Sequence, residues 1–230
     1  MKKISTAIIL CAGYGKRLRP LTNNIPKPLL KIKNITLLEN TLNLIKLLGI
    51  TKVLLNTFYL KNQIIEYLRR NDFNLDIDII EERVILDTGG GVLNLIKSSD
   101  ENDFIIFNPD TIWSASNIED IKSMENFYFS NKVKNILLVV NKDKSFDKKL
   151  KGDFIFEKNN LINSSVNDYI FTGCQIIDRD IFKNQQNEVF PMTNVWKELE
   201  KQKNLYGFES KTKFDHISDI EIYHKLLKDY

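Results

Sequence analysis

The chain of 230 residues carries 33 lysines and arginines against 30 aspartates and glutamates, a formal net charge of +3. A chain of this length fits one α/β domain that buries roughly 70 % of its unfolded surface, so we expect residues 1–230 to form a single domain. Acidic and basic residues are interspersed, and no long basic stripe follows the first loop, which excludes nucleic acid as the main partner.

The two cysteines and the N-terminal segment indicate in which cellular compartment the protein is expected. Cys11 and Cys174 each lie in an apolar, strand-like segment, which favours buried reduced thiols over a disulfide or a metal site. The apolar run behind the basic N-terminus is only about four residues long, too short for a signal peptide or a membrane span. We therefore expect a cytoplasmic protein that does not bind membranes.

The first predicted element is a buried strand, Ala7–Leu10, and the loop behind it is rich in glycine and basic residues. Gly13 and Gly15 remove two Cβ atoms where a backbone would have to approach a ligand closely. No acidic residue precedes Glu39. The cations of this loop are Lys16, Arg17, Arg19 and Lys27. This composition indicates an anion-binding site.

Three other interpretations of the loop fit less well. The dinucleotide fingerprint would need a third glycine where Leu18 stands, and the Walker phosphate loop would need Ser or Thr in place of Arg17. A solvated basic loop with no ligand would leave the absence of acidic residues unexplained.

The runs Gly13–Thr22 and Pro26–Leu30 together resemble the signature of the sugar-1-phosphate nucleotidyltransferases. The resemblance implies that Arg17 contacts the phosphates undergoing transfer and that Lys27 neutralises the transferred phosphoryl group. It also implies a nucleotide-binding loop, which comprises Cys11, Ala12, Gly13, Tyr14, Gly15 and Lys16.

Helices and strands then alternate along the first half of the chain. Apolar spacing predicts helices over residues 36–48 and 59–70 and strands over residues 52–57 and 75–81. This alternation indicates a mostly parallel sheet covered by helices.

Three glycines, residues 89–91, open a further helical pattern that ends near Lys97. A flexible loop is the structural alternative. Glycines at a helix start let backbone amides face a ligand. The resemblance implies that Gly89 and Gly90 border the nucleobase.

A buried strand, Phe104–Phe107, leads directly into Asn108, Pro109 and Asp110. Ligands of open parallel sheets bind at the carboxyl ends of the strands. Asp110 is therefore placed to hold Mg²⁺, as the resemblance also implies, with Asn108 beside the substrate. Capping of the next helix is the alternative role for Asp110.

The second half continues with predicted helices at residues 118–127 and 193–203 and strands at 135–140, 152–158, 169–177 and 205–209. A lysine-rich segment, residues 142–151, is expected to be a solvated turn, and Asn159–Asn160 is expected to turn a hairpin. The resemblance makes Asp153, Thr172 and Gly173 candidates for sugar binding. A strand-edge role for Asp153 and a β-bulge at Gly173 are the alternatives.

His216 stands where the family usually has the aspartate that completes the metal site. It could act as a neutral metal ligand or as a positive contact to a phosphate. Ser218 and Glu221 form a capping-box pattern at the start of the last helix.

The resemblance covers essentially the whole chain and implies a Rossmann-like, mostly parallel sheet with helices on both faces, the GT-A-like nucleotidyltransferase fold. It implies Mg²⁺-dependent transfer of a nucleotidyl group from a nucleoside triphosphate to a sugar-1-phosphate, by a monomer or weak homo-oligomer. The combined motifs most resemble N-acetylmuramic acid-1-phosphate uridylyltransferases, so UTP and that sugar phosphate are expected. Mannose-, heptose- or glucose-1-phosphate, phosphocholine with CTP, and an inactive nucleotide sensor stay open.

Overall fold

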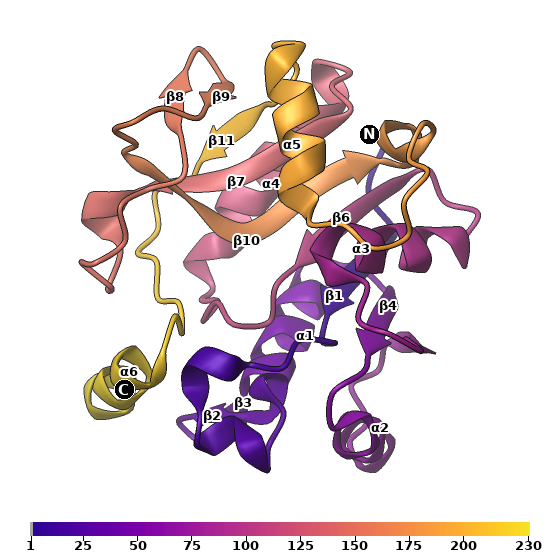
Figure 1. The fold of residues 1–230 in the computed structure, drawn as a ribbon, viewed down its shortest axis with the longest axis vertical. Coiled ribbons are helices and arrows are strands. Elements are labelled where there is room, and N and C mark those ends of the chain that lie inside the picture. Colours follow the sequence, from indigo (N-terminus) through magenta and orange to yellow (C-terminus); the bar gives the residue numbers. More distant parts are fainter. Residues whose placement is uncertain (1) are drawn as a thin grey trace.

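The computed structural model describes residues 2–230 and is built around one seven-stranded sheet (Figure 1). The strand order is β11-β7-β10-β6-β1-β4-β5, and every strand pair is parallel except the two pairs that involve β10. The strands are β1 (Thr6–Leu10), β4 (Lys52–Thr57), β5 (Asp76–Glu81), β6 (Asp103–Phe107), β7 (Asn135–Asn141), β10 (Tyr169–Asp178) and β11 (Gly207–Glu209). Two small hairpins pair β2 (Lys31–Ile32) with β3 (Ile35–Thr36) and β8 (Ile155–Glu157) with β9 (Asn160–Ile162).

Helices cover both faces of this sheet, as predicted. The helices are α1 (Leu37–Leu47), α2 (Lys61–Arg70), α3 (Asp87–Lys97), α4 (Ser116–Ser130), α5 (Met192–Lys201) and α6 (Ile220–Asp229). Because side chains alternate along a strand, Ile9 of β1 packs in one core with α1, α2 and α4, whereas Ile8 packs in a second core with α3 and α5. The predicted α/β architecture is confirmed.

Helix α1 shows how the sequence produces these elements. Thr36 caps the helix, and its hydroxyl accepts a hydrogen bond from the Glu39 amide at 3.0 Å. Leu38, Leu42 and Ile45 recur at helical spacing and are fully buried against the sheet. The predicted helix over residues 36–48 is therefore confirmed.

Two local predictions in the second half are wrong. The β8–β9 hairpin turns at Lys158 and Asn159, which both have positive φ, rather than at Asn159–Asn160. The last helix, α6, is capped by Asp219, whose carboxylate accepts from the Ile222 amide at 2.9 Å, and not by Ser218.

Ser218 instead connects α6 to the segment that was expected to be solvated. Its hydroxyl donates to the Asp147 carboxylate at 2.7 Å, and both residues are buried. Asp147 thus fixes the segment that follows His216 in the sequence. The lysine-rich composition around Asp147 gives no indication of this role.

Cys11 and Cys174 are buried and free, as predicted. Burial raises the pKa of both thiols well above the usual range, with the negative charge of Asp110 adding to the effect at Cys11. Neither thiol is therefore placed to react as a thiolate. None of the helices within residues 2–230 has the length and apolarity that a membrane crossing requires.

Candidate active site

A cavity of about 690 Å³ opens at the carboxyl ends of β1, β4 and β6. This is the edge of an open parallel sheet at which ligands bind. The cavity brings together most of the predicted site residues, namely Cys11, Ala12, Gly13, Tyr14, Gly15, Lys16, Arg17, Lys27, Asn108 and Asp110. The structure therefore places the basic loop and the predicted metal carboxylate around one cavity.

The basic loop keeps its shape through Gly15 and Thr22. Gly15 has φ +62°, a conformation that L side chains rarely adopt, and the Thr22 hydroxyl donates to its carbonyl at 2.9 Å. Tyr14 packs against Phe58 and Tyr59, and the Lys16 ammonium lies 5.2 Å from the Tyr14 ring centre. The loop is thus anchored on both sides before any ligand binds.

Arg17 is exposed at the cavity, next to Leu18, which is buried. Within residues 2–230 its guanidinium makes no hydrogen bond or ion pair. An exposed cation that lines the cavity and has no protein partner is available to an anionic ligand.

Lys27 and Asp110 form the ion pair at the floor of the cavity. The Lys27 ammonium lies 2.6 Å from Asp110 Oδ2 and donates to the Ile217 carbonyl at 2.9 Å. Burial raises the pKa of Asp110, but the positive charges of Lys27 and His216 lower it more, so that it lies well below the usual range. Asp110 is therefore ionised at any pH at which the protein would be assayed.

Asp110 also keeps one oxygen free. Its Oδ1 is buried and has no hydrogen-bond partner within the part of the chain that the structure describes. A buried, ionised oxygen without a partner is costly unless a cation occupies the place beside it. The donor set at Asp110 therefore fits a hard divalent ion of the Mg²⁺ type.

His216 lies behind this carboxylate, with Nε2 at 3.3 Å from Asp110 Oδ2. Its backbone is bound to the site, because the Ile217 amide donates to the Asp110 carbonyl at 2.9 Å. The ring stacks on Phe214, and its Nδ1 is buried with no partner among residues 2–230. The structure thus brings His216 to the predicted position next to Asp110.

The glycines at the start of α3 allow close packing against another segment and do not present their amides to a ligand. The amides of Gly89 and Gly90 both donate to the Phe190 carbonyl at 3.0 Å, so they do not face the cavity. The prediction that these two amides are open to a nucleobase is therefore wrong. The residues of this helix start that line the cavity are Asp87 and Thr88.

Gly90→Ala is expected to lower stability by roughly 1–3 kcal/mol, because an added Cβ would lie only 2.1 Å from the Glu188 carbonyl oxygen. Thermal unfolding measures the effect. Gly13→Ala is the control, because a Cβ at Gly13 has no neighbour within 4 Å, and its melting temperature should stay near the native value. Equal melting temperatures for the two variants would contradict this packing role.

The prediction that the Thr172 side chain contacts the sugar is wrong. Its hydroxyl is buried and donates to the Leu138 carbonyl at 2.9 Å, so it cannot face a substrate. Gly173, with φ +88°, forms the β-bulge that was the structural alternative and lies against Asn108.

Asp153 takes the position of a strand-edge residue. Its carboxylate accepts from the Phe171 amide at 2.8 Å. Desolvation raises the pKa of Asp153, and the hydrogen bond from the Phe171 amide and the charge of His216 partly offset this effect. A sugar contact for Asp153 stays a prediction.

Two cavity residues, Asn56 and Glu82, were not identified from the sequence. Asn56 is the next-to-last residue of β4, Glu82 directly follows β5, and both are buried. Polar residues at the carboxyl ends of apolar strands were the signal that could have revealed them.

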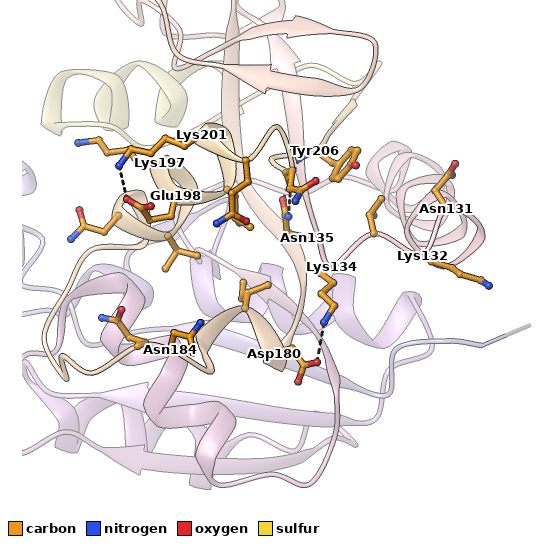
Figure 2. Close-up of a pocket in the computed structure, with 18 residues that line it drawn as sticks. Asn131, Lys132, Lys134, Asn135, Asp180, Asn184, Lys197, Glu198, Lys201 and Tyr206 are labelled. Atoms are coloured by element: carbon orange, nitrogen blue, oxygen red, sulfur yellow. Dashed lines mark hydrogen bonds and ion pairs between the residues drawn. The ribbon is translucent and has the colours of Figure 1, made fainter.

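A second cavity of about 870 Å³ is larger but contains none of the predicted site residues. It lies near Asn135, at the amino end of β7, and so at the opposite edge of the sheet. Figure 2 shows its polar lining, with Lys134 paired to Asp180 and Lys201 paired to Glu198. Size alone would have selected the wrong cavity.

The chain is similar in sequence to several known proteins. The chain is 33% identical over 212 residues to the bifunctional protein GlmU of Methanococcus aeolicus, covering 88% of this chain and 49% of that protein. It is 29% identical over 230 residues to the D-glycero-alpha-D-manno-heptose 1-phosphate guanylyltransferase of Aneurinibacillus thermoaerophilus, covering 97% of both. It is 23% identical over 221 residues to the N-acetylmuramate alpha-1-phosphate uridylyltransferase of Caulobacter vibrioides, covering 93% of this chain and 91% of that protein. The chain thus spans about half the length of the GlmU relative.

Solved structures share the fold. HddC from Yersinia pseudotuberculosis aligns with a TM-score of 0.76 at 22% identity, covering 98% of this chain and 99% of that one. The inositol-1-phosphate CTP transferase from T. maritima aligns with a TM-score of 0.81 at 16% identity, covering 98% and 95%. The sequence model of one family, described as Nucleotidyl transferase, matches residues 6–147. The chain therefore belongs to the nucleotidyl transferase family.

Proposed function

We propose that this chain transfers a nucleotidyl group from a nucleoside triphosphate to a sugar-1-phosphate. A phosphate oxygen of the sugar-1-phosphate would form a bond to the α-phosphorus, the bond from that phosphorus to the bridging oxygen would break, and pyrophosphate would leave. The observation that carries the proposal is the basic loop and the Lys27–Asp110 pair around one cavity at the carboxyl edge of the sheet.

Reactions of this type depend on positioning and charge neutralisation rather than on a protein nucleophile. Arg17 is exposed and unpaired within residues 2–230, and it would bind the phosphates of the triphosphate. Lys27 is largely buried and faces the cavity floor, where its charge would act on the phosphoryl group being transferred. Asp110 and the Ile217 carbonyl fix Lys27 before substrate binds, so this cation needs little reorganisation.

Asp110 would hold a divalent ion through its unpaired Oδ1, with His216 directed at the same carboxylate. When bound, such an ion would add positive charge close to the phosphate oxygens. One carboxylate together with substrate phosphates is a usual way to bind Mg²⁺ in phosphoryl-transfer sites.

Two substrate pairs are the leading candidates. The combined motifs favour UTP with N-acetylmuramic acid-1-phosphate, for cell-wall sugar recycling. The heptose 1-phosphate guanylyltransferase relative is 29% identical to this chain, with 97% of both chains covered, whereas the N-acetylmuramate uridylyltransferase relative is 23% identical. This similarity favours GTP with a heptose-1-phosphate as the second pair.

Release of pyrophosphate from the four ribonucleoside triphosphates and dTTP, each with a panel of sugar-1-phosphates, tests the proposal. We expect one pair to exceed all others, with UTP and N-acetylmuramic acid-1-phosphate first and GTP with the heptose phosphate second. Phosphocholine with CTP belongs in the same panel. Turnover of glucose- or mannose-1-phosphate alone would overturn both candidate pairs and leave the general activity in place.

His216 is expected to act as a positive contact to a phosphate, because its Nε2 faces the ionised Asp110 carboxylate at 3.3 Å and its charge lowers the pKa of that carboxyl. The native rate should then fall as the pH rises and the ring loses its charge. The His216→Asp variant should lose this pH dependence. A native rate that rises with pH would instead indicate a neutral metal ligand, and identical profiles would show that His216 has neither role.

A further inference from the structure

Asn56 and Glu82 connect the basic loop to the start of α3 through three hydrogen bonds, of which the first two are buried. Cys11, the first residue after β1, donates its amide to Asn56 Oδ1 at 2.8 Å. Asn56 Nδ2 donates to Glu82 Oε1 at 2.6 Å. Glu82 Oε2 accepts from the Leu86 amide at 3.1 Å. The chain of bonds therefore crosses from the loop to the residue that precedes α3.

We infer that Asn56 and Glu82 are positioning residues that set the spacing between the two walls of the nucleotide pocket. One wall is the loop from Cys11, and the other is the turn at Asp87 and Thr88. This inference rests on the proposed function and names residues that the charge-neutralising groups do not include.

The bonding pattern specifies the chemistry of each side chain. Asn56 accepts on one side and donates on the other, which an amide can do and a carboxylate cannot. Glu82 accepts on both sides, which a carboxylate can do and an amide cannot. The two side chains are therefore a matched pair.

The burial of Glu82 indicates that Asn56 and Glu82 do more than stabilise the fold. The residue is 5 % exposed, burial raises the pKa of its carboxyl, and its hydrogen-bond partners within residues 2–230 are neutral. A buried carboxylate without a cation lowers stability, so two apolar side chains would suit a purely structural contact better.

Gly91 makes room for this pair. A Cβ added there would lie 2.8 Å from Asn56 Nδ2 and 3.1 Å from Glu82 Oε1. A side chain at position 91 would therefore crowd Asn56 and Glu82, which explains the third glycine of the run. Gly91→Ala disturbs the pair without changing a polar group.

Two single substitutions and their combination test the inference. Asn56→Asp places two carboxylates face to face, and Glu82→Gln turns an amide NH₂ toward a donor. Each should raise KM for the triphosphate roughly tenfold to a hundredfold, with KM for the sugar-1-phosphate within about twofold of native.

The double variant exchanges the two chemistries and restores the chain of bonds. The new carboxylate at position 56 accepts from the Cys11 amide and from the new side-chain amide at position 82. The carbonyl oxygen of that side-chain amide in turn accepts from the Leu86 amide. KM for the triphosphate should therefore return to within about threefold of native.

Thr57→Val is the matched control, because its buried hydroxyl has no partner within residues 2–230 and its side chain does not line the cavity. It should keep the native KM values even if its melting temperature shifts. Gly91→Ala repeats the test if a single variant does not fold, and it should raise KM for the triphosphate alone.

Calorimetric titration with the four ribonucleoside triphosphates and dTTP separates the outcomes. A native chain that binds none of these nucleotides overturns the proposed function and this inference together. Native binding with unchanged KM in Asn56→Asp or Gly91→Ala overturns the positioning role alone, as does a double variant that stays as impaired as the single ones.

Discussion

Asp110→Ala is expected to reduce turnover by roughly a thousandfold or more, about 4 kcal/mol of transition-state stabilisation. The substitution removes the ionised carboxylate that Lys27 and His216 face, and with it the unpaired oxygen that fits a divalent ion. Turnover at saturating substrates, measured across a Mg²⁺ titration, checks this result. The native rate should saturate with the ion, and the variant should show no response.

Asp215→Asn is the matched control for this loss. Asp215 is one residue from His216, but its carboxylate accepts from the Tyr230 hydroxyl at 2.6 Å and does not line the cavity. It should keep native turnover. Full activity of Asp110→Ala, or full native activity in excess chelator, would contradict the role assigned to Asp110.

Arg17→Ala is expected to lower turnover by a hundredfold or more while the fold stays intact. Arg17 is exposed at the cavity and makes no side-chain bond within residues 2–230, so its removal should not move the melting temperature. Turnover at saturating substrates and thermal unfolding give the two readouts.

Arg19→Ala separates a specific contact from the general charge of the loop. Arg19 is also exposed and lies two residues away, but it does not line the cavity. The Arg19→Ala variant should lose less than about threefold in turnover, because an exposed charge outside the cavity acts weakly through solvent. Equal losses for the two variants would show that only the summed charge of the loop matters.

The first half of the fold could be predicted because its signals are local. The helical spacing of Leu38, Leu42 and Ile45 and the apolar strand cores each belong to one segment. The loop signature is also contiguous, so the sequence identified the residues that line the cavity, from Cys11 to Arg17, together with Lys27.

Contacts between distant segments could not be predicted in the same way. The Lys27 ammonium binds the carbonyl of Ile217, 190 residues away, and the loop amide of Cys11 binds Asn56. No periodicity indicates such pairs. The sequence could only suggest that polar residues at neighbouring strand ends meet at one edge.

The errors at Gly89, Gly90 and Thr172 have physical reasons. A glycine run looks the same whether a ligand or another segment lies above it, and here the segment at Phe190 does. At Thr172, the bulge at Gly173 shifts the register of β10 against β7, and such a shift alters which side chains face the ligand.

The most direct test of the account is whether pyrophosphate release by the native chain needs a sugar-1-phosphate. With triphosphate and Mg²⁺ present, we predict release only after a sugar-1-phosphate is added, with one nucleotide-sugar formed per pyrophosphate by mass spectrometry. Tight binding of a triphosphate with no pyrophosphate released for any sugar-1-phosphate would contradict the account and indicate a nucleotide-binding sensor.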